Sequence, residues 1–377
     1  MLFDIEAVQS TLLYPVSEQE QCTGDCLDSG RFGSFDPARS SSYIPIDDRG
    51  EEVWGSESFR YSEGSDILTI GGSQAEGLSF RLVPLVDQWS AVNTLALSWD
   101  SGIYYRLVDQ GLTISPSFSL WNTPGTGQAG VLFGGINMAK YHGPLHAFST
   151  ADTPKVSLPV NGVEIQLQND TSGSSISYDF PEGPFLIRTS EALTRLPLNP
   201  TMQFYTDLGI SYDSTYRKIR IPCSRRSENH TLSFRVGNIT ISAPWGAFIS
   251  QEFPDRDIDP DIVESCTFDI HPMPEERTDD YAGQLGMNII QYMYLAADYD
   301  TKVVCVAPLN LNPGPDEILE IGPGIRIPDS VGDFPETVTR YTPITTLATT
   351  GTSTQAAART AVPGMAVAGI AGLFFVL

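Results

Sequence analysis

The stretch that decides the fold is PFLIRTSEALTRLP, which covers residues 184–197. A short apolar run leads into a polar segment that begins at Arg188. The spacing of apolar residues after this point predicts a helix over residues 190–198. Similar spacing predicts helices over residues 102–110 and 200–207.

The rest of the chain has the composition of a β protein. It contains 377 residues, of which 41% are hydrophobic, so it can bury a sizeable core. Its 33 glycines and 27 prolines separate short runs rich in Val, Ile, Tyr, Phe and Thr. Short β-rich runs separated by glycine and proline are typical of many short strands joined by tight turns. We therefore predict a mostly β fold.

The charge of the chain excludes one class of partner. The net charge is −24, from 46 acidic and 22 basic residues. A surface of this sign repels nucleic acid, and no basic stripe in the sequence offsets it. We expect an acidic, well-solvated exterior and no nucleic-acid partner.

Five cysteines indicate how the chain is crosslinked. Four of them could form two disulfides, one closing the short Cys22–Cys26 loop and one joining Cys223 to Cys266. Cys305 lies in an apolar run and is predicted to be a buried free thiol. A CxxxC pair without a nearby histidine is a poor zinc ligand set. We predict no metal site and no cofactor.

Three Asn-X-Ser/Thr sequons agree with an oxidising, secretory compartment, in which disulfides persist. We expect glycans at Asn169, Asn229 and Asn238. Each sequon alone is a weak signal, and the three gain weight from the cysteine pattern.

The C-terminus has the order of a glycosylphosphatidylinositol (GPI) attachment signal. Small residues at 350–353 are followed by a short spacer and by an uncharged apolar tail at residues 361–377. We predict lipid attachment at Gly351, with a tail-anchored or single-span protein as the alternative. The N-terminus lacks the basic and apolar regions of a signal peptide. We therefore expect that the natural front of the protein is missing from this sequence.

An ordered set of segments resembles the pepsin-type aspartic proteases, in particular their fungal, GPI-anchored, yapsin-like branch. The resemblance extends over about residues 5–308, and the segments that carry it are residues 35–43, 66–72, 107–112, 117–120, 130–136 and 284–308. Residues 66–72, for example, are similar to the DTVTIGG strand of that family. The Cys22–Cys26 loop and the pair Cys223 and Cys266 stand where the family has its disulfides.

The resemblance implies a two-lobed β fold with a substrate cleft between the lobes. Residues 1–150 would form an N-terminal lobe that lacks its first strands, and residues 151–308 a C-terminal lobe. A Pro/Thr-rich stalk would cover residues 309–350, ahead of the GPI signal at residues 351–377. In the family, each lobe supplies one catalytic Asp from a D-[ST]-G loop.

Neither catalytic loop matches the family. Where the second lobe of the family reads PALLDTGSTLTYLP, Arg188 stands at the Asp and Ser190 at the Gly. In the first lobe, Glu6 stands at the Asp when the sequences are read without gaps, and Asp4 when two residues are inserted. Arginine stays protonated at any working pH and cannot relay a proton. We predict an ion pair between Arg188 and Glu6, with Asp4 as the alternate partner; otherwise both side chains face solvent.

The flap hairpin of the family, YGxGS, is matched by Trp54, Gly55, Ser56 and Glu57, followed by Ser58. Trp54 stands at the tyrosine whose hydroxyl helps to organise substrate and water in the family. We expect this tryptophan either to contact a bound ligand or to be an exposed or self-packed loop residue.

Together these features predict a catalytically inactive homologue of aspartic-type endopeptidases with a cell-surface binding or structural role. The expected partner is a peptide or a cell-wall protein in the cleft, and the expected state is a monomer. The expected location is the cell surface or cell wall, with a GPI lipid in the plasma membrane. One alternative is an active endopeptidase that uses Glu6 or Asp4 with an unconventional partner. Another is a decayed gene product with no stable fold.

Overall fold

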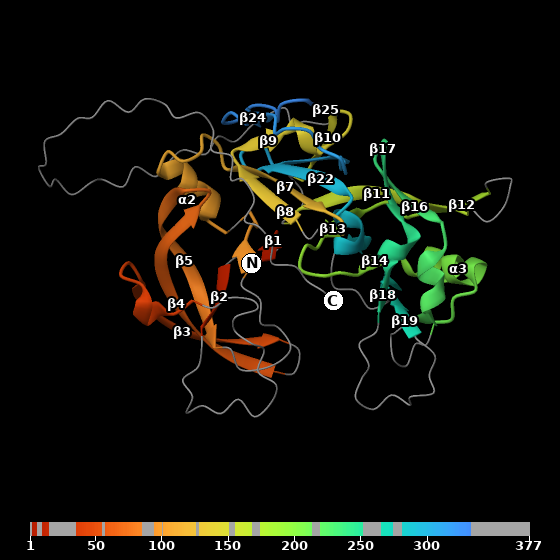
Figure 1. Cartoon of the computed structure of the whole chain (residues 1–377), viewed down its shortest axis with the longest axis horizontal. Coiled ribbons are helices and arrows are strands. Elements are labelled where there is room, and N and C mark those ends of the chain that lie inside the picture. The colour runs from red at the N-terminus through yellow and green to blue at the C-terminus, as the bar shows by residue number, and fades with distance from the viewer. Residues whose placement is uncertain are drawn as a thin grey trace, which may run out of the picture.

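The computed structural model (Figure 1) describes residues 2–5, 10–14, 35–54, 57–84, 94–99, 101–125, 128–150, 155–167, 174–212, 219–251, 265–273 and 281–332. Several predicted features lie outside these residues: Glu6, the Cys22–Cys26 loop, Gly55, Ser56, Asn169, and residues 351–377 with Gly351.

The first half of the molecule is built on a six-stranded sheet of order β1-β6-β2-β5-β4-β3. Its strands are β1 (Leu2–Asp4), β2 (Ser10–Tyr14), β3 (Ile44–Trp54), β4 (Glu57–Ile70), β5 (Ser73–Pro84) and β6 (Thr94–Ala96). A 3-10 helix, η1 (Pro37–Arg39), precedes β3, and helix α2 (Ile103–Asp109) follows β6. Strands β3 and β4 form a long antiparallel hairpin whose turn begins where Trp54 pairs with Glu57.

A second six-stranded sheet, of order β25-β10-β23-β22-β7-β8, bridges the two halves of the molecule (Figure 1). Its strands are β7 (Ser117–Thr123), β8 (Gln128–Phe133), β10 (Leu145–Ser149), β22 (Met293–Asp298), β23 (Val303–Pro308) and β25 (Ser330–Gly332). Helix η2 (Met138–Lys140) lies between β9 (Gly135–Asn137) and β10, and β9 pairs with β24 (Ile318–Glu320). Because distant parts of the chain share this sheet, its pairing fixes the two halves to each other.

The second half contains an eight-stranded sheet and a three-stranded sheet. The larger sheet has the order β17-β16-β11-β13-β21-β14-β20, with β12 also paired to β11. Its strands are β11 (Ser157–Gln166), β12 (Ser175–Asp179), β13 (Pro184–Ile187), β14 (Thr194–Leu196), β16 (Thr231–Val236), β17 (Ile239–Pro244), β20 (Ile270–Pro272) and β21 (Gly283–Leu285). The smaller sheet contains β15 (Arg220–Pro222), β18 (Ile249–Gln251) and β19 (Ser265–Phe268).

The described helices are short, with at most 11 residues each. The second half contributes α3 (Leu198–Leu208), α4 (Met287–Ile290), η3 (Cys223–Ser227) and η4 (Trp245–Phe248). One large apolar cluster runs from Ile5 in the first half to Val306 in the second, so the halves share a core. This arrangement confirms the predicted mostly β fold. Among the described residues, no helix is both long enough and apolar enough to cross a membrane.

Two of the three predicted helices are confirmed, as α2 and α3, and the third is wrong. Within residues 190–198, the segment Thr194–Leu196 is strand β14, which pairs with β20 and β21. Thr194 and Leu196 are 0% and 1% exposed, while Arg195 lies on the opposite face of the sheet. This alternation is that of a strand, and pairing on both sides outweighs the local helical pattern.

The predicted stalk is also wrong for residues 309–332. Strand β24 pairs with β9, and β25 pairs in parallel with β10. Ile321 and Ile327 are 0% and 1% exposed and belong to a second apolar cluster beside the bridging sheet. This segment, rich in Gly and Pro, packs on the sheet because its isoleucines bury apolar area there.

Candidate functional site

Two loops that are far apart in the sequence meet between the halves of the molecule. The backbone N–H of Ile5, just after β1, donates to Thr189 Oγ1 over 3.2 Å. Ile5 is 1% exposed and Thr189 is 3% exposed, so this hydrogen bond is buried. It joins the segment that leads into Glu6 to the segment that contains Arg188. The predicted ion pair between Arg188 and Glu6 requires these two segments to meet. Glu6 itself lies outside the described residues, and the side chain of Asp4 is likewise not described.

The backbone before Arg188 is held by strand pairing. In β13, Phe185 and Ile187 are both 0% exposed, and the strand runs parallel to β21. The Ile187 N–H donates to the Val156 carbonyl over 3.1 Å, and the Arg188 N–H donates to the Leu285 carbonyl over 2.9 Å. Arg188 is therefore placed by the end of a buried strand, and its side chain is 31% exposed.

The side chain of Arg188 is paired with Glu191. Arg188 Nη1 donates to Glu191 Oε1. Glu191 Oε2 accepts from Gln284 Nε2 over 2.6 Å and lies 3.6 Å from Arg195 Nη2. One carboxylate is thus contacted by two guanidinium groups and one amide. The predicted pair between Arg188 and Glu6 stays a prediction, and Glu191 is a partner that the sequence analysis did not identify.

These contacts keep Glu191 ionised. Burial by itself raises the pKa of Glu191, but the hydrogen bond from Gln284 and the positive charges of Arg188 and Arg195 outweigh it. The pKa of this carboxyl is therefore below its ordinary value. At neutral pH, Glu191 is a carboxylate that accepts hydrogen bonds and has no proton to donate.

A polar row crosses the sheet beside this pair. Gln284 on β21 is the register partner of Arg195 on β14, and Arg195 is that of His271 on β20. Burial and the neighbouring Arg195 guanidinium lower the pKa of His271 to about 4. His271 is accordingly neutral at neutral pH and does not add to the positive charge. We refer to Arg188, Glu191, Arg195, His271 and Gln284 as the Arg188 site.

Below the Arg188 site, the loop is fixed by buried hydrogen bonds. Thr194 Oγ1 lies 2.5 Å from Asn288 Oδ1 and accepts from the Gly286 N–H over 3.0 Å. The Glu191 carbonyl accepts from the Met287 N–H over 2.8 Å. A Cβ at Gly286 would lie 2.2 Å from the carbonyl oxygen of Leu193, so only glycine fits there. The backbone that carries Glu191 and Arg195 is therefore locked in place from the core side.

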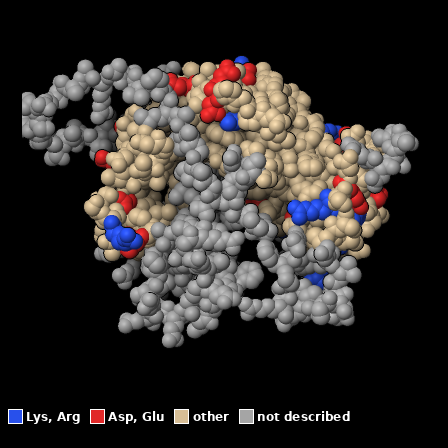
Figure 2. Space-filling model, in the orientation of Figure 1, with Lys and Arg blue, Asp and Glu red and all other residues tan. Residues whose placement is uncertain are grey.

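Charged side chains lie at the surface both near this region and over β24. Figure 2 shows Lys and Arg together with Asp and Glu side chains near β14 and α3, and mainly Asp and Glu side chains over β24. Within the described part of the chain, no group of three or more His, Cys, Asp or Glu side chains is arranged to hold a metal ion. The chemistry of the Arg188 site is that of fixed charges and hydrogen-bond donors.

The residues of the predicted flap can be located only in part. The turn of the β3–β4 hairpin falls at Trp54 and Glu57, where the flap was expected, but the side chains of both residues are not described. Gly55 and Ser56 are outside the described residues. The role of this hairpin as a flap therefore stays a prediction.

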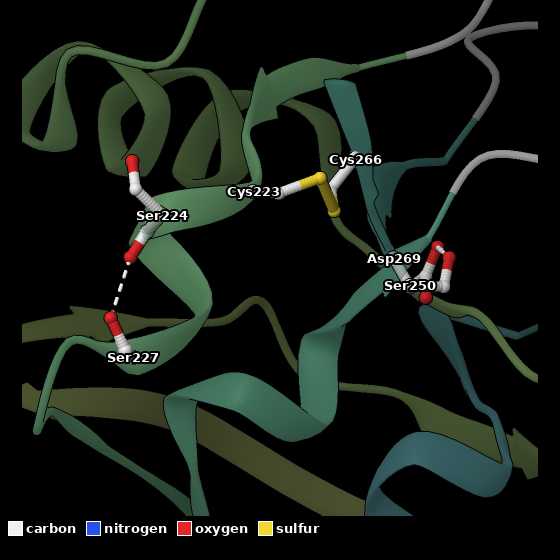
Figure 3. The surroundings of a disulfide bond; sticks show 6 residues. All are labelled: Cys223, Ser224, Ser227, Ser250, Cys266 and Asp269. Carbon is white, nitrogen blue, oxygen red and sulfur yellow. Dashed lines mark hydrogen bonds between the residues drawn. A yellow bond between two sulfur atoms is a disulfide. The ribbon is translucent and has the colours of Figure 1, made fainter. Parts of the chain in front are cut away.

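One of the two predicted disulfides is present. Cys223 and Cys266 are bonded, with Cα atoms 4.9 Å apart, and they join the start of η3, just after β15, to β19 (Figure 3). Beside the bond, Ser227 Oγ donates to the Ser224 carbonyl over 2.8 Å, and Ser250 Oγ donates to Asp269 Oδ1 over 3.1 Å. Cys305 is free and buried, as predicted.

Two of the three predicted glycosylation sites can be located. Asn229 lies in an exposed position just before β16. Asn238 is exposed in the turn between β16 and β17. Both asparagines are open to solvent, while attachment of a glycan at either stays a prediction.

Comparison with known proteins identifies the family. The sequence pattern of the family "Eukaryotic aspartyl protease" matches residues 11–309. The chain is 27% identical to the probable aspartic-type endopeptidase opsB of Aspergillus fumigatus, over 89% of this chain and 71% of that protein. It is 24% identical to candidapepsin of Candida tropicalis over 75% of this chain and 68% of that protein, and 22% identical to secreted aspartic protease 5 of Candida albicans over 74% and 64%. The chain belongs to the eukaryotic aspartyl protease family.

Proposed function

We propose that this protein is a non-catalytic aspartyl protease homologue that binds a peptide or protein segment where its two halves meet. The proposal rests on the presence of Arg188 directly after β13. The next residue in this loop, Thr189, accepts a hydrogen bond from the backbone N–H of Ile5. In the aspartic protease mechanism, two carboxylates lie close together and share one proton. A guanidinium at one of these positions can neither accept the proton of the attacking water nor return one to the substrate.

Glu191 is a poor replacement for the missing acid. Its carboxylate contacts Arg188, Arg195 and Gln284, and these groups lower its pKa. A general acid must hold a proton at the working pH, and a general base is more effective when its pKa lies near that pH. A carboxylate stabilised by two cations meets neither requirement.

An active endopeptidase is the second candidate function. It would use Glu6 or Asp4 as one carboxylate, with Glu191 as the unconventional partner. Two of the relatives are named as an endopeptidase and a protease, and Glu191 lies three residues after Arg188; both observations favour this candidate. It requires that Glu191 take up a proton in spite of both guanidinium groups.

We place the protein in the fungal, GPI-anchored, yapsin-like branch, as a disulfide-containing glycoprotein of the cell surface or cell wall. The Cys223–Cys266 bond, the exposed Asn229 and Asn238, and the small-residue cluster with its apolar tail at residues 361–377 support this location. Release of the protein from intact cells by a phosphatidylinositol-specific phospholipase tests the anchor. Retention on the membrane after this treatment would favour a single-span tail.

Peptide capture tests the binding function. The purified full chain is mixed with a random peptide library, bound peptides are separated with the protein by gel filtration, and their masses are determined. We expect intact peptides to elute with the protein. Recovery of no peptide would contradict the binding role, and recovery of shortened peptides would favour the endopeptidase.

A further inference from the structure

The last described segment of the chain covers one edge of the bridging sheet. The family pattern ends at residue 309, and the chain then continues through β24 and β25, which lie beside β9 and β10 in Figure 1. Residues 311–315, which lead into β24, are exposed and include two prolines and a glycine. We refer to residues 316–332 as the strap. An exposed linker thus joins the strap to the rest of the fold.

Short strands hold the strap in place. Strand β24 pairs with β9 over three residues, and β25 pairs with β10 over three residues. The Ile321 N–H donates to the Gly134 carbonyl over 2.9 Å. The Leu145 N–H donates to the Asp329 carbonyl over 3.0 Å, and the Tyr141 hydroxyl donates to Asp329 Oδ2 over 2.9 Å. Among the described residues, each strand of the strap is paired on one side only.

The strap buries few side chains of its own. All of its residues are described, and only Ile321 and Ile327 are buried, at 0% and 1% exposed. Leu319, Ile325 and Val331 are 38%, 54% and 43% exposed. In the bridging sheet, by contrast, every residue of β22 is buried, and β22 is paired on both sides. Because local unfolding has a low free energy where few apolar contacts are buried and backbone hydrogen bonds lie near solvent, the strap should open more readily than β22.

Opening of the strap would uncover groups that are unfavourable in water. Strand β10 would lose its partner on one side, and its backbone groups there would form an unpaired sheet edge. Ile136, Tyr141 and Leu145 share an apolar cluster with Ile321 and Ile327 and would lose part of their cover. An unpaired edge beside exposed apolar side chains is a template for pairing with another chain. The closed strap therefore protects this edge.

We propose that the strap is a cover that opens and closes as one unit while the rest of the protein stays folded. In the closed state it keeps the β10 edge from pairing with a strand of a second copy of the chain. Opening breaks no covalent bond: the pairing of β24 and that of β25 are lost together, and residues 311–315 act as the hinge.

Hydrogen–deuterium exchange of the full chain, followed by mass spectrometry, tests whether the strap is one unit. Tyr141→Phe removes the hydrogen bond to Asp329 and keeps the ring in the apolar cluster. We expect amides across the whole strap, including that of Ile321, to exchange about fivefold faster than in the wild type, while those of β22 keep their rate. Tyr178→Phe is the matched control and should leave the strap unchanged. The Tyr178 hydroxyl also donates to a carboxylate, Asp207, over 2.9 Å, and both tyrosines are 6% exposed.

A second pair of variants tests the protective role. Ile327→Asp places a charge at a buried position and should hold the strap open. Ile325→Asp makes the same change on the outer side of the strap, at a position that is 54% exposed. In sedimentation velocity, we expect Ile327→Asp to form dimers or larger species at concentrations at which the wild type and Ile325→Asp do not. Its β22 amides should stay protected from exchange.

Three results would overturn the inference. If Tyr141→Phe accelerated exchange in β25 and left β24 at the wild-type rate, the strap would not be one unit. If β22 lost its protection together with the strap in Ile327→Asp, the strap could not open without the rest of the fold. If Ile327→Asp lost the protection of its strap and still sedimented like Ile325→Asp, the strap would not protect the β10 edge.

Discussion

The two faces of strand β14 are built from different interactions. On the core side, Thr194 is 0% exposed and binds Gly286 and Asn288 through its hydroxyl. On the other side, Arg195 is 32% exposed and lies beside the Glu191 carboxylate. The core face depends on close fit between neutral groups, and the outer face on charges that water can replace. The neutral core contacts can therefore hold the loop before β14 in place even when substitutions change the charged residues on its outer face.

The largest effect is expected at the closest backbone approach on the core face. In Gly286→Ala, the added methyl group would lie 2.2 Å from the Leu193 carbonyl oxygen and 2.7 Å from that of Ala192. Because backbone must move to relieve the overlap, we expect the free energy of unfolding to fall by about 3 kcal/mol or more. Urea unfolding monitored by circular dichroism measures it. Gly314→Ala is the control, since a Cβ there meets nothing within 4 Å. A loss below about 1 kcal/mol in Gly286→Ala would contradict the close fit.

The outer face should contribute a pH dependence through His271. The unfolded chain protonates this histidine below about 6.5, whereas the folded protein keeps it neutral down to about 4. The unfolded state therefore binds more protons in this window, and stability is lost as the pH falls from about 6.5 to 4. The buried carboxyls of Asp269 and Asp298 act in the opposite direction, since burial raises the pKa of each to about 6.

The variant His271→Gln separates this contribution from those of Asp269 and Asp298. We expect the wild type to lose about 2 kcal/mol more than the variant between pH 6.5 and pH 4. Unfolding by urea at several pH values in that range measures the difference. His142→Gln, at an exposed position, should keep the wild-type profile. Parallel profiles for the wild type and His271→Gln would show that the fold does not exclude a charge at this position.

A smaller loss is expected when the core face loses one hydroxyl. In Thr194→Val the shape is kept, but the Gly286 N–H and Asn288 Oδ1 lose their hydrogen-bond partner. Leaving buried polar groups unpaired costs about 1–2 kcal/mol. Thermal unfolding measures the change, and Thr206→Val is the matched control because its hydroxyl bonds to the Met202 carbonyl on an exposed helix surface. If the two variants lost the same amount of stability, the buried Thr194 hydroxyl would contribute no more than an exposed one, and the core face would not depend on its hydrogen bonds.

The smallest effect is expected for the charged pair itself. Glu191→Gln removes the ion pairs with Arg188 and Arg195, and pairs that water can reach contribute about 0–1 kcal/mol. We expect the unfolding midpoint of this variant to match that of Glu228→Gln, which removes a comparable pair with Arg225. A much larger loss would mean that the outer face stabilises the fold and is not free to exchange its partners.

Much of the architecture is predictable from the sequence because short β-rich runs and glycine-rich turns follow one another in a recognisable order. Helices α2 and α3 are predictable from the local spacing of their apolar residues, and the Cys223–Cys266 bond from the position of the two cysteines in the family resemblance. Residues 190–198 are not, because β14 is a strand only through its pairing with β20 and β21. Residues 309–332 resemble a stalk in composition, and only the folded structure shows that Ile321 and Ile327 are buried.

The candidate site is predictable in part. The alignment of motifs identifies Arg188 as the residue that replaces an acid, and the structure places its loop against Ile5. The partner Glu191 is close in sequence, but the contact depends on the turn before β14 and on Gln284, which comes from β21. The contacts of Glu191 depend on how the backbone turns between β13 and β14, and the spacing of residues in the sequence does not define that turn.

A peptide-cleavage assay shows whether the protein has lost endopeptidase activity. Folded full-length protein is incubated with a mixed peptide library from acidic to neutral pH, and products are identified by mass spectrometry beside a buffer control. We expect no cleavage above the control at any pH, because a guanidinium occupies the position of a proton-sharing carboxylate. Defined products that disappear in Glu6→Gln, Asp4→Asn or Glu191→Gln would show that the protein is an active endopeptidase in spite of Arg188.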